Sequence, residues 1–289
     1  MIEKKEMCRH NMDKYLGAIN KIIPFSCVDG PGNRSAIFFQ GCGFNCIYCH
    51  NPETKNHCNH CKKCVKVCQT KALNIIDDKV FWEKDKCCNC DLCIRVCENK
   101  STPKISFMTV DEVFNHIDSA LPYINGITVS GGECTLQEKF ITQLFKKAKT
   151  FGKTSFVDTN GQNDFSKMKE LTKEMDMAML DIKAYDKEEH ISLTGISKDI
   201  VFENFEYLAS INKLYEVRTV ILPEYLDNKK TVIEVGKILR KYPNVRYKLI
   251  KCQKHNIEEL KNFTMPSDDY MKELYSLAYE NGARNIIIT

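Results

Sequence analysis

The 289-residue sequence contains no run of about 18 apolar residues, the shortest length that suits a membrane-spanning helix. Its first residues, MIEKKEMCRHNMDKYL, lack the apolar core of a secretory signal peptide. It also lacks low-complexity tracts and the stripe of basic and aromatic residues typical of proteins that bind single-stranded nucleic acid. We therefore expect a cytoplasmic protein that acts neither on membranes nor on nucleic acids.

Cysteine, in contrast, is abundant, with 16 residues. So many cysteines would suggest disulfides in a secreted protein, but in a cytoplasmic protein they indicate bound metal. The net charge of +4 assumes neutral thiols, and iron-bound thiolates would bring the loaded protein close to neutrality. The net charge therefore indicates no particular partner. A chain of this length can form one large domain and a small second one.

Three cysteines lie close together in the stretch GCGFNCIYCHNPE, as the triplet Cys42, Cys46 and Cys49. Three thiolates can hold three irons of a 4Fe–4S cluster and leave the fourth iron without a protein ligand. The amine and carboxylate of S-adenosylmethionine could bind that open iron, and one electron from the cluster would then break the sulfonium carbon–sulfur bond. On its own, the triplet could also be half of a zinc site.

Two runs of four cysteines follow, each with the spacing C-x2-C-x2-C-x3-C of bacterial two-cluster ferredoxins. In that pattern the fourth cysteine of each run binds the other cluster. We therefore predict two further 4Fe–4S clusters, one bound by Cys58, Cys61, Cys64 and Cys97 and the other by Cys68, Cys87, Cys90 and Cys93. Gln69 and Glu98 stand where a proline usually follows the fourth cysteine. Cys88 is expected to bind no cluster.

Around the cysteine-rich stretch, apolar strands alternate with helical segments. We expect strands at 35–41, 126–132, 154–159, 177–183, 215–222 and 245–250, with a seventh at 284–288. We expect helices from Thr109 to about Pro122 and at about 137–150, 165–175, 200–212, 229–241 and 267–281. This order predicts an α/β fold with a parallel sheet, a partial (β/α)6 barrel of the TIM type. Residues 1–53 and 105–289 would form the barrel, and residues 54–104 an inserted ferredoxin-like domain with two 4Fe–4S clusters.

Polar or metal-binding groups follow the ends of four successive strands, and in barrels of this kind the chemistry gathers at the carboxyl ends of the strands. The groups are Cys42, then Gly131, Gly132 and Glu133, then Asp158, Thr159, Asn160 and Gly161, and finally Asp181 and Lys183. The sequence therefore predicts one active site at this edge of the sheet.

Together these motifs, with SGGE, VDTNG, MLDIK and the upstream SCVDGPGNRS, resemble the radical S-adenosylmethionine activases of glycyl radical enzymes. The likeness runs from about Ile19 to Thr289, and the eight-cysteine insertion is most similar to the YjjW-type branch. It implies an oxidoreductase that cleaves S-adenosylmethionine to methionine and a 5′-deoxyadenosyl radical. That radical would take a hydrogen atom from a glycine in the C-terminal loop of a partner enzyme. The likeness also implies an anaerobic setting, a reductant such as flavodoxin or ferredoxin, and a monomer when free.

The resemblance also implies roles for single residues. The triplet would hold the catalytic cluster, and Gly131, Gly132 and Glu133 would bind the amine of S-adenosylmethionine. The rest of the cosubstrate, with a monovalent cation, would contact Asp158, Thr159, Asp181, Lys183, Arg218 and the Met179 carbonyl. The backbone of the partner would bind at Asp29, Gly30, Pro31 and Gly32. Family members often have a histidine after the sixth strand, and Lys251, Gln253 and His255 are the residues near that place.

Simpler interpretations of these features stay open from the residues alone. A glycine pair can form an ordinary turn, two acids can be solvated, and Arg218 can be exposed. Two other functions fit the cysteines. One is a radical enzyme that acts on a small molecule or a nucleic acid base. The other, in a different class, is a multi-cluster electron carrier in which a residue such as His50 completes the third cluster. Cys27 and Cys134 are expected to pack in the interior.

Overall fold

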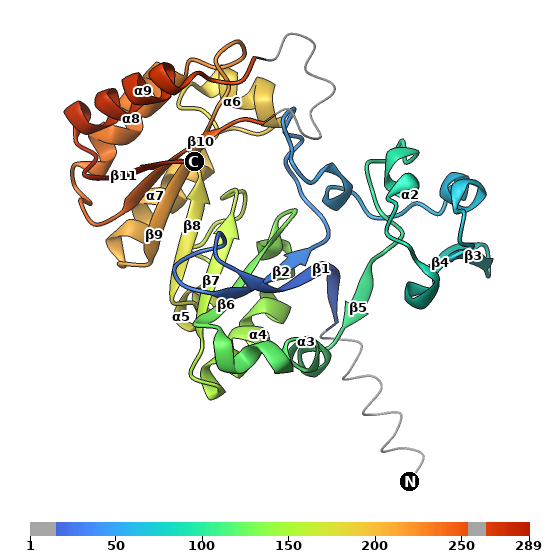
Figure 1. Ribbon diagram of the computed structural model, residues 1–289. Coiled ribbons are helices and arrows are strands. Elements are labelled where there is room, and N and C mark those ends of the chain that lie inside the picture. Colours follow the sequence, from blue (N-terminus) through green and yellow to red (C-terminus); the bar gives the residue numbers. More distant parts are fainter. Residues whose placement is uncertain (1–15, 254–263) are drawn as a thin grey trace. The chain divides into compact units, whose positions relative to one another are not determined.

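A computed structural model of the chain describes residues 16–253 and 264–289 (Figure 1). The chain divides into two compact units. The first unit comprises Met1–Cys42 and Asn51–Lys153, and the second comprises Gly43–His50 and Thr154–Thr289. The stretch 54–104 lies in the first unit, and its border as a separate domain stays a prediction.

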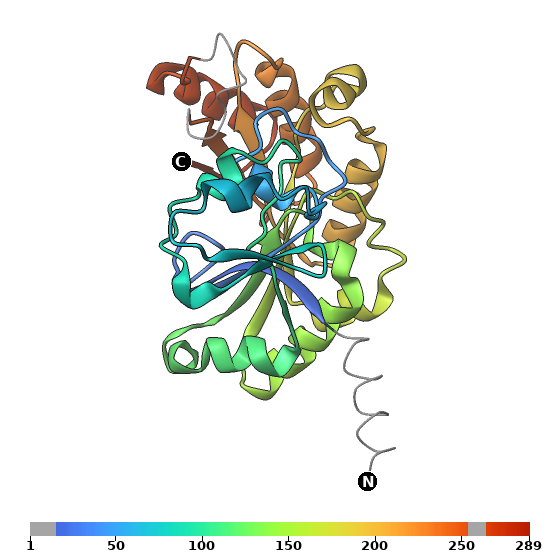
Figure 2. The ribbon, with the colours of Figure 1, turned by 90° about the vertical axis from the view of Figure 1, so that its right-hand side faces the viewer.

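The first unit contains four sheet strands in the order β6-β2-β1-β5 (Figure 2). Strands β2 (Arg34–Phe39) and β6 (Gly126–Gly131) are parallel, as predicted for the strands at 35–41 and 126–132. In contrast, β1 (Gly17–Ser26) pairs antiparallel with both β2 and β5 (Ser106–Met108), so the prediction of a wholly parallel sheet was wrong. The pairing of β1 with β2 has two register irregularities, and burial along β1 does not alternate, so β1 lacks the period-two pattern that reveals a strand.

The predicted helix after Thr109 is shorter than expected. It begins with the expected capping box, in which the Glu112 amide donates to Thr109 Oγ1 (3.2 Å) and the Thr109 amide donates to the Glu112 carboxylate (2.7 Å). However, α3 (Val110–His116) ends early, and a 3-10 helix, η5 (Asp118–Tyr123), contains Pro122. A proline interrupts α-helical hydrogen bonding, which explains the change of helix type.

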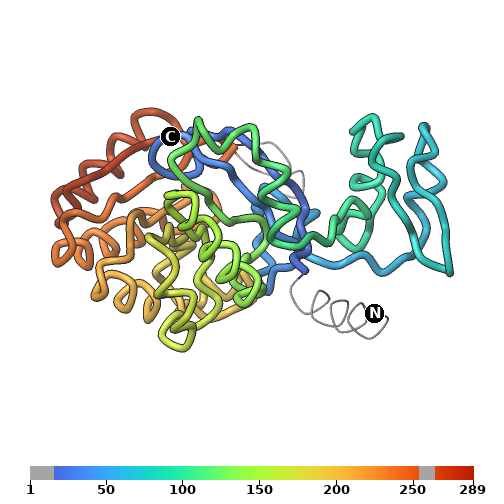
Figure 3. Tube along the Cα trace, turned by 90° about the horizontal axis from the view of Figure 1, so that it is seen from below, coloured from blue at the N-terminus to red at the C-terminus, as the bar shows by residue number. Residues whose placement is uncertain are grey.

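The remaining elements of the first unit are short, apart from α4. The order is η2 (Pro52–Thr54), η3 (Lys63–Val67), β3 (Leu73–Ile76), β4 (Lys79–Trp82), η4 (Lys84–Lys86), α2 (Leu92–Arg95), η6 (Cys134–Gln137) and α4 (Glu138–Thr150). Strands β3 and β4 form an antiparallel hairpin (Figure 3). Its two turn residues, Asp77 and Asp78, have positive φ angles of 47° and 63°, as the tight turn of such a hairpin requires. The buried face of the hairpin packs Leu73 and Val80 against Cys64 and Cys93.

The second unit contains five parallel strands in the order β11-β10-β9-β8-β7. These are β7 (Thr154–Thr159), β8 (Met177–Asp181), β9 (Leu214–Ile221), β10 (Arg246–Lys251) and β11 (Asn285–Ile288). All five match predicted strands to within about two residues. The short apolar runs that predicted them are therefore buried strands of a parallel sheet.

Helices of the second unit follow the strands. They are α5 (Lys169–Glu174), α6 (Lys187–Thr194), α7 (Asp199–Ser210), α8 (Asn228–Leu239) and α9 (Asp268–Asn281). The sequence KEEHISLT of α6 has no apolar periodicity, and this helix was not predicted. Its ends are nevertheless typical, because Asp186 caps the first turn and Gly195 ends the helix with a φ of 83°. No helix within the described ranges is long and apolar enough to cross a membrane.

Candidate active site

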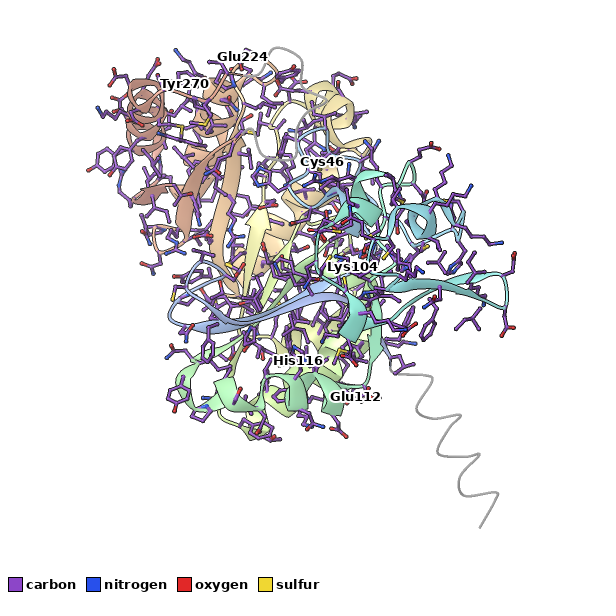
Figure 4. All side chains as sticks on the ribbon, turned by 45° about the vertical axis from the view of Figure 1, so that its right-hand side comes forward. Cys46, Lys104, Glu112, His116, Glu224 and Tyr270 are labelled. Carbon is purple, nitrogen blue, oxygen red and sulfur yellow. The ribbon has the colours of Figure 1, made fainter. Side chains whose placement is uncertain are left out.

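The loop that carries the cysteine triplet is fixed by main-chain hydrogen bonds. In the first unit the Cys42 amide donates to the Lys55 carbonyl (2.9 Å). In the second unit the Asn45 amide donates to the Thr194 carbonyl, at the end of α6 (2.7 Å), and Cys46 follows it (Figure 4). All three cysteines of the triplet are partly exposed. Each cysteine of the triplet is thus accessible, and an open 4Fe–4S cluster needs three such thiols.

Tyr48, between the last two cysteines of the triplet, anchors the loop in the core of the second unit. Its side chain is 3% exposed and belongs to an apolar cluster that includes Leu193 and Cys252. The ammonium of Lys183 lies 5.6 Å from the centre of the Tyr48 ring and 2.6 Å from an Asp181 carboxylate oxygen. Burial disfavours the charged amine, but Asp181 and the other anionic groups around it outweigh this and raise the pKa of Lys183 well above its usual value. Lys183 therefore stays protonated beside the triplet loop.

Arg218 points into the second unit. Its guanidinium donates to Asp158 (2.8 Å) and to Glu216 (2.5 Å), and the Glu216 side chain, 0% exposed, also accepts from Arg246. Burial lowers the pKa of Arg218, but Asp158 and Glu216 outweigh that effect and keep it above its usual value. The interpretation of Arg218 as an exposed residue is therefore wrong.

The two acids at the strand ends each have a basic partner. Asp158, the last residue but one of β7, pairs in register with Met179 of β8, and Asp181 of β8 pairs in register with Arg218 of β9. Asp158 binds Arg218, and Asp181 binds Lys183, so neither carboxylate is simply solvated. These pairs already balance both negative charges, and the monovalent cation stays a prediction.

The glycine pair at the end of β6 allows two main-chain segments to touch. Gly131 has a φ of 118°, and a side-chain carbon there would lie 2.2 Å from the Phe39 nitrogen. At Gly132 such a carbon would lie 2.2 Å from the Gly41 oxygen. The pair therefore brings Glu133 beside the segment that leads to the triplet, where the Glu133 amide donates to the Gly41 carbonyl (2.7 Å). The fully buried Glu133 carboxylate accepts from the Thr135 amide (3.0 Å). An ordinary turn would not need both glycines.

We expect a Gly131→Ala substitution to destabilise the first unit by at least about 3 kcal/mol, because the new methyl group collides with main-chain atoms that cannot move aside. Gly152→Ala is the matched control, since Gly152 also has a positive φ (63°) but has no atom within 4 Å of the added carbon. The control should lose only about 1 kcal/mol. Urea unfolding followed by circular dichroism measures both, and equal losses would contradict this explanation of Gly131.

Two cavities in the cysteine-rich stretch are each lined by four cysteines of the ferredoxin pattern. Cys58, Cys61, Cys64 and Cys97 line one cavity, and Cys68, Cys87, Cys90 and Cys93 line the other. Cys93 lines the first cavity as well, and Cys88 lines the second. The fourth cysteine of each run thus lines the cavity of the other run. Among residues 16–253 and 264–289, no three His, Cys, Asp or Glu side chains lie close enough together to bind one metal ion. A 4Fe–4S cluster places its cysteines on four different irons, so its ligands surround a cavity.

Left-handed backbone conformations recur at matching places in the two cysteine runs. His60 and Asn89 have φ angles of 55° and 54°, and Lys62 and Asp91 have φ angles of 67° and 58°. Such residues turn successive main-chain N–H groups toward one point and create a nest for an anion. The His60 amide, for instance, donates to the sulfur of Cys58 (3.4 Å). The two cysteine runs therefore share one loop conformation, which would suit anionic groups held by cysteine sulfurs.

The sequence model of the radical SAM superfamily matches residues 36–235 of this chain. The chain belongs to the radical SAM superfamily. A solved structure, that of QueE from Escherichia coli, superposes with a TM-score of 0.53 over 95% of this chain and 94% of that one, at 10% sequence identity. This likeness supports an α/β radical SAM fold with a mostly parallel sheet.

Curated relatives cover nearly the whole of this radical SAM protein. A candidate glycyl-radical enzyme activating enzyme of Haemophilus influenzae is 27% identical over 93% of this chain and 95% of its own length. The pyruvate formate-lyase-activating enzyme of Staphylococcus epidermidis is 29% identical over 92% of this chain and 96% of its own length. The same-named enzyme of Staphylococcus aureus strain USA300 is 28% identical over 90% and 94%.

The turn Asp29–Gly32 of this radical SAM enzyme lies at the amino ends of β2 and β6, whereas Cys42 and Glu133 follow the carboxyl ends of the same strands. Two of its glycines need their conformational freedom, with φ angles of 124° at Gly30 and 72° at Gly32. A strand of six residues spans about 20 Å, which separates the turn from the predicted cosubstrate site along the sheet.

Several other expectations can be compared with the structure. Cys134 is buried, as expected, but Cys27 is exposed, so its predicted packing was wrong. Lys251 forms an ion pair with Asp268, and His255 lies outside the described residues. Sequence reasoning missed Glu216 and Tyr48. An acid inside the apolar strand YEVRTVIL was the signal for Glu216, because a buried carboxylate needs a cation.

Proposed function

We propose that this radical SAM enzyme is a glycyl radical enzyme activating enzyme of the YjjW-type branch that works in an anaerobic cytoplasm. The observation that carries the proposal is the anchored cysteine triplet in a chain that matches activating enzymes over at least nine-tenths of both lengths. When bound, a 4Fe–4S cluster would supply one electron for the cleavage of S-adenosylmethionine to methionine and a 5′-deoxyadenosyl radical, which would take a hydrogen atom from a glycine of the partner.

The residues of the chain would bind and orient the reactants. Cys42, Cys46 and Cys49 would hold the catalytic cluster, and Gly131, Gly132 and Glu133 would bind the amine of S-adenosylmethionine. The remaining contacts would come from Asp158, Thr159, Asp181, Lys183 and Arg218, with Met179 and a monovalent cation. The geometry supports this assignment, because the protonated Lys183 and Arg218 offer positive charge to the carboxylate of the cosubstrate.

The glycine of the partner would lie at the cosubstrate, beyond the carboxyl ends of the strands, because the 5′-deoxyadenosyl radical must touch the carbon from which it takes the hydrogen. The turn Asp29–Gly32, about 20 Å away along the sheet, would bind the main chain of the partner at a part of the loop more distant from that glycine. Glycine suits this reaction because it has no side chain and fits a narrow site. Residues that shield the reacting carbon from water protect a radical from side reactions.

Two further 4Fe–4S clusters would occupy the two cysteine-lined cavities and receive electrons from flavodoxin or ferredoxin. A Cys97→Ala variant should lose the iron of one inserted cluster, about a third of the total, because Cys97 lines the cavity with Cys58, Cys61 and Cys64. Cys88→Ala is the matched control and should keep all its iron. Iron analysis and Mössbauer spectroscopy measure both. Equal iron contents would contradict the assignment of Cys97.

The function is tested with a candidate partner, a large enzyme that has a glycine loop near its C-terminus. The reduced activase and S-adenosylmethionine should generate in that enzyme the doublet signal of a glycyl radical by electron paramagnetic resonance. A partner in which the target glycine is replaced by alanine should give no doublet. Cleavage of S-adenosylmethionine without any radical on the partner would contradict this function and favour a small-molecule substrate.

A further inference from the structure

The β3–β4 hairpin carries the single tryptophan of the chain, Trp82 at the end of β4. Side chains of a strand alternate between its two faces, so Trp82 lies on the same face as Val80 and on the opposite face from Phe81. Val80 is buried and Phe81 is 55% exposed. Trp82 also pairs in register with Leu73 and packs, with it and Val80, against the cysteine side of the hairpin. The strand therefore places an indole ring beside the cysteine runs.

The indole N–H of Trp82 has no hydrogen-bond acceptor. Its nitrogen, Nε1, is buried and donates to no oxygen, nitrogen or sulfur atom of residues 16–253 and 264–289. The cysteine sulfurs nearby are therefore not its partners. A buried N–H without an acceptor costs about 1–3 kcal/mol, so such groups are rare in folded proteins. An unpaired N–H at this place indicates an acceptor that the polypeptide itself does not supply.

Trp82 lines the cavity of Cys68, Cys87, Cys90 and Cys93. It also borders a wider cavity of about 720 Å³, but an N–H directed into so large a space would be open to water, and Nε1 is not. In the part of the chain that the structure describes, Nε1 is the only buried, unpartnered side-chain atom whose residue lines either cysteine cavity. We therefore place the missing acceptor in the cavity of the Cys68 set.

A water molecule fits this cavity poorly as the acceptor. A buried water needs two to four polar partners, and most of the lining consists of cysteine sulfurs and apolar side chains such as Leu73 and Leu92. Of the charged residues in the lining, Lys104 and Asp91 already pair with each other (2.5 Å). A 4Fe–4S cluster held by the four cysteines would bring inorganic sulfides, which are anionic acceptors, into the same space.

We propose that the Trp82 indole donates a hydrogen bond to a sulfide of the cluster that Cys68, Cys87, Cys90 and Cys93 would hold, and that this bond raises the reduction potential of that cluster. The inference rests on the inserted clusters of the proposed function. Reduction makes a cluster more negative, so an N–H donor stabilises the reduced form more than the oxidised form. Trp82 is thus a tuning residue, through which this inserted cluster accepts an electron more readily.

A Trp82→Phe variant of the loaded protein tests the proposal, because phenylalanine keeps an aromatic ring and removes the N–H. One reduction potential should fall, so that the equilibrium constant for reduction of that cluster drops by about tenfold, which is about 59 mV for one electron. The other potentials should not change. Anaerobic redox titration followed by electron paramagnetic resonance measures them. Phe81→Leu is the matched control, since it changes the neighbouring ring on the opposite face, and it should leave every potential unchanged.

A second replacement separates the hydrogen bond from packing. Because Trp82 is the only tryptophan, benzothienylalanine can be incorporated at this position alone. This analogue has nearly the shape of tryptophan but has sulfur in place of the N–H. It should lower the same potential as Trp82→Phe, and iron analysis should show that all clusters remain. If Trp82→Phe loses iron, the analogue decides by itself.

The outcomes that contradict the proposal differ from those that contradict the proposed function. Unchanged potentials with the analogue would overturn the hydrogen bond, even if Trp82→Phe shifts a potential, since packing alone would then explain that shift. In a Cys97→Ala chain, which should lack the other inserted cluster, the shift should persist; its loss would also overturn the proposal. An insertion that binds no iron would overturn the inserted clusters as well. The glycyl radical signal on the partner tests the activase function independently of these results.

Discussion

A Cys46→Ala variant, reduced and supplied with S-adenosylmethionine, is expected to release no 5′-deoxyadenosine and to keep roughly two thirds of its iron. The triplet has only three thiols, so the loss of one leaves the catalytic cluster with too few ligands. The two proposed inserted clusters would use other cysteines, which line cavities elsewhere in the chain, and should therefore stay. Chromatography of the products and iron analysis of the same sample give the two results.

Cys27→Ala is the control for this loss, because Cys27 is exposed and belongs to none of the predicted ligand sets. The control should keep both its iron and its activity. If Cys46→Ala still cleaves the cosubstrate, the assignment of the triplet is wrong. If instead it loses nearly all its iron, the inserted clusters depend on the triplet, and the cysteine sets are not independent.

The second large effect is expected on stability, from a Glu216→Gln substitution. The Glu216 carboxylate is 0% exposed and accepts hydrogen bonds from both Arg218 and Arg246. Its neutralisation leaves two guanidinium groups without this anion, and Arg218 is only 11% exposed. Arg218 keeps Asp158, but Arg246 loses this anion, and breaking a buried ion pair on one side costs about 3 kcal/mol or more. Chemical unfolding under anaerobic conditions measures the loss.

The control for Glu216 is Glu273→Gln. Glu273 also pairs with a basic residue, Lys229, but both side chains are about half exposed, at 47% and 49%. Water screens such a pair, so its loss should change the free energy of unfolding by less than about 1 kcal/mol. Similar losses of unfolding free energy in the two variants would show that the buried ion pairs of Glu216 stabilise the fold no more than an exposed pair, which would contradict this prediction.

Local patterns in the sequence account for much of the fold. The strands of the second unit are short apolar runs between turns, and such runs predict buried parallel strands without knowledge of their neighbours. Helix α9 begins at Ser267 and ends before Gly282 because both capping signals are local. In contrast, β1 has no alternating pattern, and its antiparallel pairing with β2 depends on a partner further along the chain.

In the candidate site, too, local sequence patterns predict some features and not others. The exchange of the fourth cysteines was predicted from spacing alone and stays a prediction, although Cys97 lines the cavity of the first run and Cys68 that of the second. The orientation of Arg218 was left open, since an arginine in a strand can face either side of the sheet. It depends on Asp158, which is sixty residues away in the sequence, and on Glu216. Sequence spacing carries no signal for contacts of this kind.

The central claim is that one iron of the triplet cluster has no ligand from the protein and binds S-adenosylmethionine. Electron nuclear double resonance on the reduced enzyme, with cosubstrate isotopically labelled at its amine nitrogen, tests this claim most directly. We predict a coupling between the labelled nitrogen and the cluster that is absent in the Cys46→Ala variant. A loaded protein in which all clusters have four side-chain ligands, and in which no such coupling arises, would contradict the account.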